Sequence, residues 1–377
     1  MSCFDSINGY NILGDNMKPY DNTDLPIEIK YDLEMMRLLL QARDLFGKYN
    51  AIIMYQCIPQ HLLLKPFMFQ ESFKSCELSG NKISQSALYF AKYETNNDNY
   101  NEIINYYRVL ANIEKYISPN FKLSVSYLNK IHRDILNTKL GIYRTPGKYR
   151  SKVSWIGRRG TSVYEAEYVP THPIEISVAM ANYVKHFNKS YSLDKFVDAA
   201  VSHAQFENIH PYNDGNGRLG RILIPIQVFT ETNTHISLFL SEIIKENEFM
   251  YIKKLKDTRT GKWESYIKFF LELVIKQLDN NIKKLNEIRS IYEVDKEVSM
   301  SAMNKKWGEK VYHYLFSNIT STAKEASSIL SIEYQTIRNY FNKLFDMGLL
   351  SKHKIHNGEY VYTYIKMYNV HIPIDWV

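Results

Sequence analysis

The sequence predicts a mainly α-helical protein that carries one short β-hairpin in its middle and a small separate unit at its C-terminal end. Two observations support this fold class. Apolar residues recur at the three- and four-residue spacing of helices over most of the chain, whereas alternating strand patterns are confined to residues 153–169 and 351–365. A length of 377 residues is typical of two or three domains.

The composition is that of an ordinary globular protein, with 23% charged and 45% hydrophobic residues. The net charge of +7 suits an anionic ligand or an acidic partner without requiring either. Cys3, Cys57 and Cys76 form no CxxC pair and no metal-ligand spacing, which favours a reducing, cytoplasmic compartment. We see no secretion signal, and the apolar run at 51–64 is broken by polar residues, so we expect no membrane association.

The N-terminal region, residues 1–115, is expected to be helical after a loose leader at residues 1–25. The spacing of apolar residues predicts helices at 27–51, 69–80 and 93–115. Gly80-Asn81 is expected to end the second of them, because both residue types readily adopt the left-handed conformation of a helix C-terminus.

Residues 116–278 are expected to form a central domain. A helix at 125–136 is followed by a turn-rich stretch at 141–150 and by two short strands, 153–157 and 167–170, which would pair as a hairpin. Four further helices are predicted, at 174–187, 193–209, 237–255 and 262–274. A stretch rich in glycine and charge separates the second of these four helices from the third.

A charged helix at 275–296 leads out of the central domain, and we assign 279–300 as a connector. Residues 301–377 are expected to be a separate unit. Its alternating strands are joined at His356-Asn357-Gly358, and Asn-Gly in that position is a strong hairpin signal. Its three short helices are predicted at 307–316, 323–330 and 334–347. Three helices followed by a hairpin resemble a winged helix-turn-helix, whose recognition helix would begin near Gln335.

The partner of this C-terminal unit is left open by its charge. Residues 301–377 hold nine Lys and Arg against six Asp and Glu, a balance of +3. That balance is a thin basis for the phosphate contacts that drive DNA binding. Because winged helices also bind proteins, DNA and a protein partner both remain as alternatives.

The stretch 209–225 combines an imidazole, a carboxylate, an asparagine, three glycines and two arginines, with apolar runs on both sides. Gly215, Gly217 and Gly220 lack a Cβ, so the backbone there can take positive φ angles and approach an anion closely. Residues from Arg218 onward resemble the start of a buried helix. Its free N–H groups and its dipole would face the same anion.

The side chains of this stretch suit a nucleotide polyphosphate. Arg218 and Arg221 are three residues apart, so they share a helix face and suit bidentate contacts with phosphate. Asp214 is a hard oxygen ligand of the kind that magnesium accepts. His210 titrates near neutrality, which makes it the natural general base. Pro211 is expected to end the preceding helix beside it.

The complete pattern resembles the signature of the Fic family, His-Pro-Phe-x-(Asp/Glu)-Gly-Asn-Gly-Arg-x-x-Arg. It matches at every position except that Tyr212 stands where phenylalanine is usual. The resemblance implies a Fic-type helical bundle with a hairpin flap. It also implies a magnesium-dependent transfer of AMP from ATP to a Tyr, Thr or Ser hydroxyl of a target protein, with release of pyrophosphate. A simple glycine-rich turn would account for Gly-Asn-Gly alone but not for the whole pattern.

The resemblance also implies a role for each residue of the motif. His210 would deprotonate the incoming hydroxyl, Asp214 would hold Mg²⁺, and Arg218 and Arg221 would bind the β and γ phosphates. Tyr251 stands where relatives often place an aromatic ring beside adenine, although a core position is the alternative. The expected nucleotide-binding set is Gly215, Asn216, Gly217, Arg218, Gly220, Arg221 and Tyr251.

A regulatory position follows from the same resemblance. Many Fic proteins carry a helix with the pattern Ser/Thr-x-x-x-Glu-Gly/Asn, whose glutamate pairs with the second motif arginine. The register of Ser75 and Gly80 puts Ser79 at the glutamate position. A neutral serine cannot form that ion pair with Arg221, which implies weaker autoinhibition and no removal of AMP from targets. Two alternatives remain: Glu77 acts through a shifted helix, or the segment is a capped core helix.

The hairpin at 153–169 resembles the flap on which Fic proteins dock their targets by adding an extended peptide to a strand edge. A plain surface hairpin is the alternative. Two other functions also remain open. One is transfer of a different phosphate-containing group, and the other is a nucleotide-sensing DNA-binding regulator, against which the intact His210 argues. The target, the acceptor residue and the oligomeric state are left undecided, with a homodimer as one option.

Overall fold

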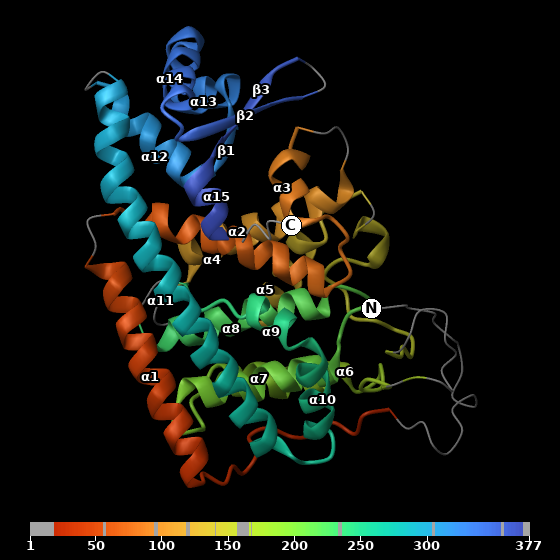
Figure 1. Cartoon of the computed structure of the whole chain (residues 1–377). Helices are drawn as coiled ribbons and strands as arrows, with labels where there is room; N and C mark the ends of the chain where they lie inside the picture. The colour runs from red at the N-terminus through yellow and green to blue at the C-terminus, as the bar shows by residue number, and fades with distance from the viewer. Residues whose placement is uncertain are drawn as a thin grey trace. The chain divides into compact units, whose positions relative to one another are not determined.

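The computed structural model describes residues 19–55, 58–93, 97–117, 121–139, 141–156, 166, 168–232, 236–303, 306–355 and 358–371. These residues are mainly helical, as predicted, with one small antiparallel sheet (Figure 1). The chain divides into two compact units. The first comprises Met1–Phe46, Glu71–Lys82 and Asn101–Leu278, and the second comprises Gly47–Gln70, Ile83–Tyr100 and Asp279–Val377. The units combine parts of several predicted segments, so the four-segment division stays a prediction.

The first helix, α1 (Leu33–Met54), begins six residues later than the sequence predicts. The carboxylate of Asp32 accepts a 2.9 Å hydrogen bond from the backbone N–H of Met35. This is the geometry of a helix N-cap, which satisfies one of the free N–H groups of the first turn. The local cap, and not the apolar pattern that starts at residue 27, therefore decides where α1 begins.

The second helix, α2 (Gln60–Leu78), ends where it was predicted to end but starts earlier and continues through Pro66. Burial explains the extension, because the side chains of Leu62, Leu63 and Leu64 are at most 3% exposed. At its C-terminus Gly80 has a φ of +93°, and the N–H of Asn81 donates to the carbonyl of Cys76 at 3.0 Å. That bond is the wide closure of a left-handed helix cap.

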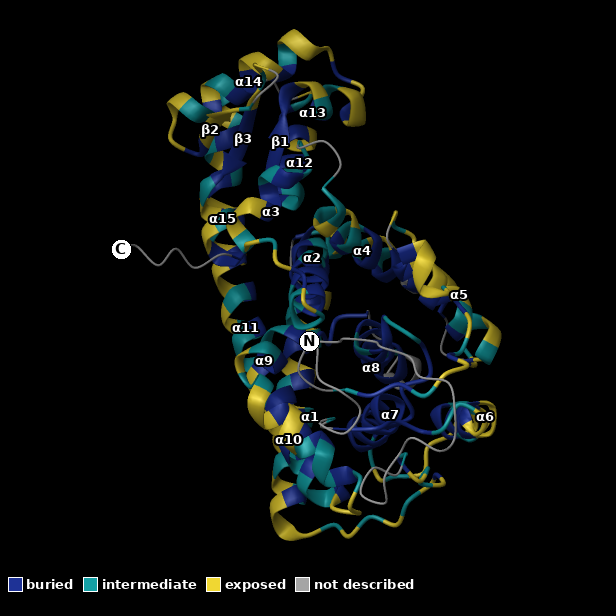
Figure 2. Cartoon of the chain, turned by 90° about the vertical axis from the view of Figure 1, so that its right-hand side faces the viewer, coloured by how far each residue is buried: buried dark blue, intermediate teal, exposed yellow. Residues whose placement is uncertain are grey.

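Unit 1 is built around two helices that pack directly against each other, α7 (Lys195–Ile209) and α8 (Asn216–Thr232). Every residue of α7 is buried, and both helices appear dark blue along most of their length in Figure 2. The surrounding helices of this unit are α4 (Asp98–Tyr116), α5 (Val125–Ile135), α6 (Ile176–Phe187), α9 (Ser241–Glu246) and α10 (Glu248–Thr258). The loop between α7 and α8 thus joins the two helices at the centre of this unit.

Two predicted helix boundaries are wrong. The single helix expected at 237–255 is divided at Asn247 into α9 and α10. Conversely, α11 (Trp263–Ala302) is one continuous helix where a core helix and a connector were predicted. Periodicity alone does not locate such boundaries, because both the divided and the continuous segments keep a helical apolar spacing.

Unit 2 contains the three helices and the hairpin strands predicted for the C-terminal segment. The helices are α12 (Gly308–Asn318), α13 (Ala323–Leu330) and α14 (Tyr334–Asp346). Strands β2 (Leu350–Lys354) and β3 (Tyr360–Tyr364) pair antiparallel, and β1 (Thr320–Thr322) adds to β3 in the order β1-β3-β2. His356 and Asn357 lie outside the described residues. The short helices α3 (Gln85–Ala91) and α15 (Ile365–His371) and strand β1 were not predicted, and the winged-helix assignment stays a prediction.

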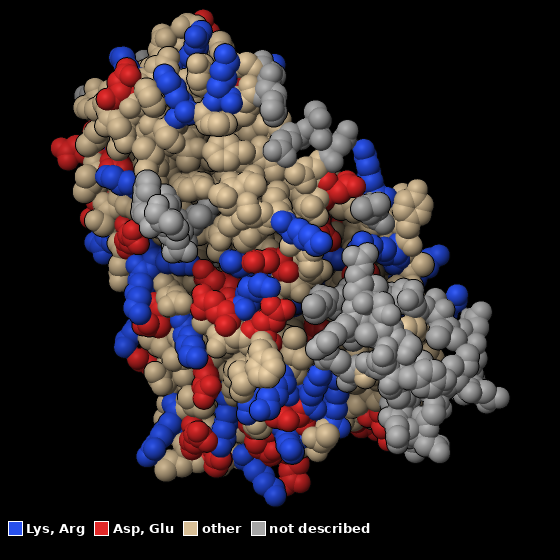
Figure 3. Space-filling view, turned by 45° about the vertical axis from the view of Figure 1, so that its right-hand side comes forward, with Lys and Arg blue, Asp and Glu red and all other residues tan. Residues whose placement is uncertain are grey.

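Two further features of the described residues concern surface charge and the apolar character of the helices. On the face that Figure 3 shows, basic and acidic side chains lie beside one another and do not separate into one broad region of a single sign. Among the helices that the structure describes, none combines the length and apolar character needed to cross a bilayer.

Candidate functional site

His210 lies directly after helix α7, at the turn that leads into the glycine loop. The helix ends at Ile209, as the presence of Pro211 predicted. His210 adopts a left-handed conformation with a φ of 51° and a ψ of 60°, and its N–H donates to the carbonyl of Phe206 at 2.9 Å. Left-handed backbone is uncommon for residues other than glycine, and it often marks a functional turn.

Asn216 holds the glycine loop closed. Its side-chain Oδ1 accepts from the N–H of Tyr212 at 2.9 Å, and its Nδ2 donates to the carbonyl of Tyr212 at 2.8 Å. Helix α8 begins at this residue, so its first N–H groups lie beside the loop. Free N–H groups and the positive end of the dipole make such a helix start suitable for an anion. Asn216 therefore shapes the proposed phosphate cradle through its amide.

The three glycines have different roles, and only one of them uses the freedom to take a positive φ angle. That one is Gly215, with a φ of +79°, while Gly217 and Gly220 lie inside α8. A Cβ at Gly217 would lie 2.9 Å from Nη1 of Arg221. A Cβ at Gly220 would collide with the carboxylate of Glu207. Gly217 and Gly220 thus make room for charged side chains, which sequence spacing does not reveal.

Tyr212 is fixed in place by a histidine that the sequence did not single out. The rings of His132 and Tyr212 stack with their centroids 3.8 Å apart and 11° between their planes. His132 Nδ1 accepts from the N–H of Gly147 at 2.7 Å, so its proton lies on Nε2, which donates to the carbonyl of Asp214 at 2.7 Å. The Tyr212 hydroxyl donates to Asn129 Oδ1 at 2.7 Å, which accommodates tyrosine at this position.

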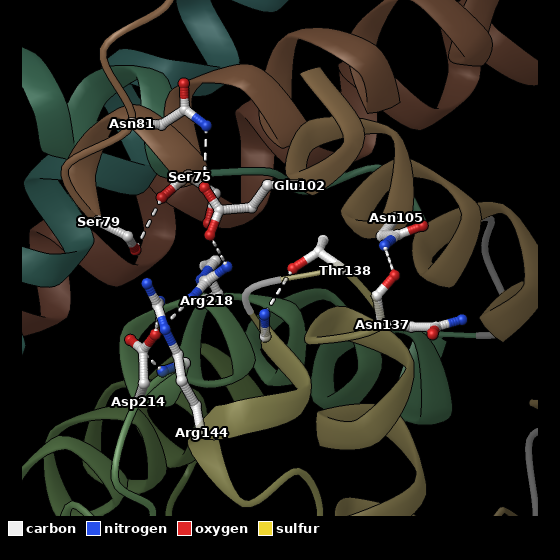
Figure 4. A network of polar contacts seen from close by, with 12 residues as sticks. Ser75, Ser79, Asn81, Glu102, Asn105, Asn137, Thr138, Arg144, Asp214 and Arg218 are labelled. Carbon is white, nitrogen blue, oxygen red and sulfur yellow. Dashed lines mark hydrogen bonds and ion pairs between the residues drawn. The ribbon is translucent and has the colours of Figure 1, made fainter. Parts of the chain in front are cut away.

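The two arginines of the motif point to different partners. Arg218 is 1% exposed and forms ion pairs with Glu102 and with Asp214, whose Oδ2 lies 3.3 Å from its Nη2 (Figure 4). Arg221 instead donates from Nε to Ser75 Oγ at 2.8 Å and from Nη2 to the Ser75 carbonyl at 2.8 Å. The three-residue spacing therefore does not bring both guanidinium groups to one point.

Ser79 contacts Arg221, at the position where the resemblance placed it. Its Oγ accepts a 2.9 Å hydrogen bond from Nη2 of Arg221. The contact is a neutral hydrogen bond, which is weaker than the ion pair that a glutamate would form. Glu77 forms an ion pair with Lys74 at 3.0 Å. The regulatory role of Ser79 itself stays a prediction.

A cavity of about 240 Å³ opens beside the glycine loop, within unit 1. Its polar residues and aromatic side chains converge in the manner of a small-molecule site. The predicted site residues that line it are Ser79, His210, Asp214, Gly215, Asn216, Gly217, Arg221 and Tyr251. Arg218 and Gly220 are not among its lining residues.

His210 is held neutral in this cavity. Burial, together with the nearby charges of Arg150 and Arg259, lowers the pKa of its imidazole to about 3. A hydrogen bond with the backbone of Glu207 and the charge of Asp214 act in the opposite direction. A neutral imidazole has a free lone pair, so His210 is in the protonation state that a general base requires.

Tyr251 presents its ring and not its hydroxyl to the cavity. The hydroxyl lies 2.8 Å from Nε2 of His203, and Nδ1 of the same histidine lies 3.2 Å from the carbonyl of Gly220. Tyr251 is 8% exposed and lines the cavity together with Ile252 and Leu255. An aromatic face between two aliphatic side chains is a suitable surface for a flat ring.

Asp214 is the one predicted metal ligand. The protein groups around it suit only a metal that is coordinated mainly by water and by its bound phosphates. Its carboxylate accepts from the N–H of Gly215 at 2.7 Å and pairs with Arg144 and Arg218. Burial acts to raise the pKa of Asp214, but the two arginines outweigh it and the pKa lies below its usual value. The described residues contain no cluster of three or more metal-binding side chains. One carboxylate fits magnesium bound mainly through phosphate and water.

The predicted flap has its base at the same cavity. Ile156 and Tyr168 form an antiparallel bridge, with N–H to carbonyl distances of 2.8 and 3.1 Å, and both residues line the cavity. Instead of two strands, the described residues of this segment form isolated bridge positions, and residues 157–165 and 167 lie outside the description. The guanidinium of Arg150, which precedes this segment in the chain, donates to the carbonyl of His210 at 2.9 Å.

Among the charged residues near the site that were not predicted, four make contacts that bear on it. They are Glu102, Arg144, Glu207 and Arg259. Arg259 lines the cavity, with its guanidinium 3.0 Å from the centre of the Tyr168 ring. Glu207 lies one helical turn before His210, and that spacing is the only sequence signal that indicates any of the four.

The fold and this site define a mainly helical protein with a glycine loop at the start of a buried helix. Residues 122–228 match the Fic/DOC family, so this part of the chain is a Fic domain. The solved structure of a Fic family protein from Desulfovibrio desulfuricans aligns with 92% of this chain and 98% of its own, with a TM-score of 0.57 and 14% identity. Fic-1 from C. elegans aligns with 67% of this chain and 73% of its own, with a TM-score of 0.52 and 17% identity.

Curated relatives match a smaller part of the chain. A protein named "Protein adenylyltransferase Fic" from Drosophila willistoni is 24% identical over 184 residues, which are 48% of this chain and 34% of that protein. A protein of the same name from Culex quinquefasciatus is 25% identical over 123 residues, which are 32% of this chain and 24% of that protein. The matched region thus spans 34% or less of each of these relatives.

Proposed function

We propose that this protein is a protein adenylyltransferase, which transfers AMP from ATP to a Tyr, Thr or Ser hydroxyl of a target protein. The observation that carries the proposal is that His210, the first turn of α8 and Arg221 line one cavity. A base, an anion-binding helix start and a guanidinium are the groups that transfer from a nucleoside triphosphate requires. The adenylyltransferase names of the relatives support the same reaction.

In the proposed reaction, His210 takes the proton of the acceptor hydroxyl while the hydroxyl oxygen attacks the α-phosphorus of ATP. An oxygen–phosphorus bond forms, and the bond from the α-phosphorus to the oxygen that bridges to the β-phosphate breaks. Pyrophosphate leaves with that electron pair. The chain supplies positioning and charge neutralisation and forms no covalent intermediate of its own.

The remaining residues are assigned by their contacts. We assign the backbone from Gly215 to Gly217 and the guanidinium of Arg221 to the phosphates, and the ring of Tyr251 to the base. Arg218 acts through Asp214, with which it is paired. Asp214 is the proposed ligand of Mg²⁺, which would neutralise phosphate charge when bound.

We further propose that the target docks on residues 153–169. Support comes from the bridge between Ile156 and Tyr168, which places the base of this segment at the cavity that holds His210. Because Ser79 forms only a neutral hydrogen bond with Arg221, we also propose that the enzyme is weakly autoinhibited.

A second candidate function, DNA binding, is favoured by the exposed residues of unit 2. Helix α14 exposes Gln335, Arg338 and Asn339, and strand β2 exposes Lys352 and Lys354. Amide and guanidinium groups suit base edges, and lysines suit phosphates. Binding of a labelled duplex that weakens steeply with salt would support this function, and no binding at low salt would exclude it.

The test of the transferase proposal uses the full chain, Mg²⁺ and ATP labelled on either the α- or the γ-phosphate, with a cell lysate as the source of targets. We expect label from the α-phosphate to appear on protein hydroxyls, and His210→Ala to abolish it while ATP binding persists. Label from the γ-phosphate alone would instead indicate transfer of phosphate. Equal loss of transfer and of ATP binding in the variant would refute the role of His210 as base.

A further inference from the structure

The carboxyl group of Glu207 has no assigned role, yet it lines the candidate cavity. It lies on α7 three residues before His210 and is only 9% exposed. Its Oε1 is buried and, among the described residues, has no hydrogen-bond partner. A buried carboxylate oxygen without a hydrogen-bond donor is unfavourable even where the charges of Arg221 and Arg259 act on the group, so its retention requires an explanation.

A second buried glutamate shows that this fold does supply partners where a carboxylate is structural. Glu71 is 3% exposed, and its oxygens accept from the N–H of Ser241 at 3.0 Å, from the Ser241 hydroxyl and from the Tyr106 hydroxyl at 3.1 Å. Glu207 is no deeper in the protein. Its Oε1 instead lies buried beside Gly220 without a donor, and Gly220 lacks the Cβ that would fill the same space.

The charge of Glu207 excludes the phosphates as its partner, since like charges repel. The neighbouring side chains indicate the base instead. His203 lies one helical turn before Glu207 on the same face of α7 and holds the hydroxyl of Tyr251 at 2.8 Å. The same histidine contacts the carbonyl of Gly220, against which Glu207 is packed. Glu207 therefore lies on the side of the cavity where the ring of Tyr251 is exposed.

We propose that Glu207 reads the base of the bound nucleotide by accepting a hydrogen bond from its exocyclic amino group. This inference rests on the proposed function, because it requires a nucleoside triphosphate in the cavity. An amino-bearing base supplies the donor that the open carboxyl lacks. A base with a carbonyl at that position would place two acceptors against each other, so the cavity would reject it.

The test compares the binding of ATP, inosine triphosphate and 2′-deoxy-ATP to the full chain by calorimetry in the presence of Mg²⁺. It is run at about pH 8, where the carboxyl group of Glu207 is ionised although burial raises its pKa to about 7. Inosine triphosphate differs from ATP by a carbonyl in place of the amino group. We expect the wild type to prefer ATP by about 10- to 100-fold, the range for a hydrogen bond to a charged group. Glu207→Gln is expected to reduce that preference to within about threefold, because its amide also donates to a carbonyl.

Two controls separate base reading from a general loss of structure. Glu248→Gln alters another carboxylate of the cavity, one that pairs with Lys245 at 2.7 Å, and should keep the preference for ATP. Inorganic triphosphate should bind wild type and Glu207→Gln equally, which shows that the phosphate half of the site is intact.

Several outcomes would overturn the inference. Equal binding of ATP and inosine triphosphate by the wild type would do so, as would an unchanged preference in Glu207→Gln. If the wild type binds 2′-deoxy-ATP more weakly than ATP and Glu207→Gln does not, the carboxylate contacts the ribose instead of the base. If no triphosphate binds the wild type, the proposed function fails together with the inference, and this result is distinct from binding without preference.

Discussion

Nη2 of Arg221 donates hydrogen bonds to Ser79 Oγ at 2.9 Å and to the carbonyl of Ser75 at 2.8 Å. The guanidinium that we assign to the phosphates is thus held by neutral oxygens alone on the α2 side. Neutral acceptors restrain an arginine less strongly than a carboxylate does, and they place no negative charge where a phosphate would lie. The site is therefore open to an anion.

The first prediction is that Ser79→Glu lowers AMP transfer. A carboxylate at this position would pair with Arg221 and repel the terminal phosphate, with a loss of about 10- to 100-fold in kcat/KM expected from a charged hydrogen bond. Ser79→Ala is the matched control and should have little effect, because Ser75 still holds the arginine. An unchanged or raised rate in Ser79→Glu, measured with labelled ATP, would show that residue 79 does not reach the phosphate site.

The second prediction concerns the pH dependence of transfer. An ordinary histidine base would produce an ascending limb in kcat/KM near about pH 6.5. Burial, with Arg150 and Arg259 nearby, lowers the pKa of His210 to about 3, so this limb should be absent above about pH 5. Initial rates measured from about pH 5 to 8 at constant ionic strength check this. If kcat/KM does show an ascending limb near neutrality, and substitutions of other ionisable residues leave that limb in place, the limb belongs to His210. That result would contradict the neutral state of His210.

The parts of this site that could be predicted from the sequence are those set by local chemistry. Pro211 ends α7 beside His210 and Gly80 ends α2, because each acts on the backbone next to it. The pairing of Arg218 with Glu102 joins residues 116 positions apart, and no spacing rule indicates it.

The same distinction explains the errors. Glycine is needed at positions 217 and 220 because charged side chains of the packed helices take the space of a Cβ there. That need is a property of tertiary contacts. Helix α2 passes through Pro66 because the burial of neighbouring leucines outweighs a local penalty. Positions decided by packing between distant segments are therefore the ones that sequence patterns miss.

The third prediction is that ionisation of Glu207 lowers the free energy of unfolding as the pH rises. Burial raises its pKa from 4.5 to about 7, although Arg221 and Arg259 act to lower it. The folded state thus binds more protons than the unfolded chain between these two values, so the free energy of unfolding falls as the pH rises through this window. Glu207→Gln removes the titration and should gain about 2–3 kcal/mol relative to wild type between about pH 5 and pH 8.

Urea denaturation at both pH values measures this change. Glu248→Gln serves as the control, because Glu248 is partly exposed and paired with Lys245, and its effect should be the same at both pH values. If the stabilities of wild type and Glu207→Gln run parallel with pH, Glu207 does not carry a raised pKa in the folded state.

The fourth prediction tests the contact between Gly220 and Glu207 directly. A Cβ at Gly220 would collide with Oε1 of Glu207, so Gly220→Ala should destabilise the protein by about 1–3 kcal/mol, as overpacking does. Gly47→Ala is the control, because that helical glycine has open space around it and alanine favours helix. Removing the carboxyl group should relieve the collision. The double variant Gly220→Ala with Glu207→Ala should therefore be more stable than the sum of the single changes, by about 1 kcal/mol or more. Strict additivity of the two unfolding free energies would mean that Gly220 is required for another reason.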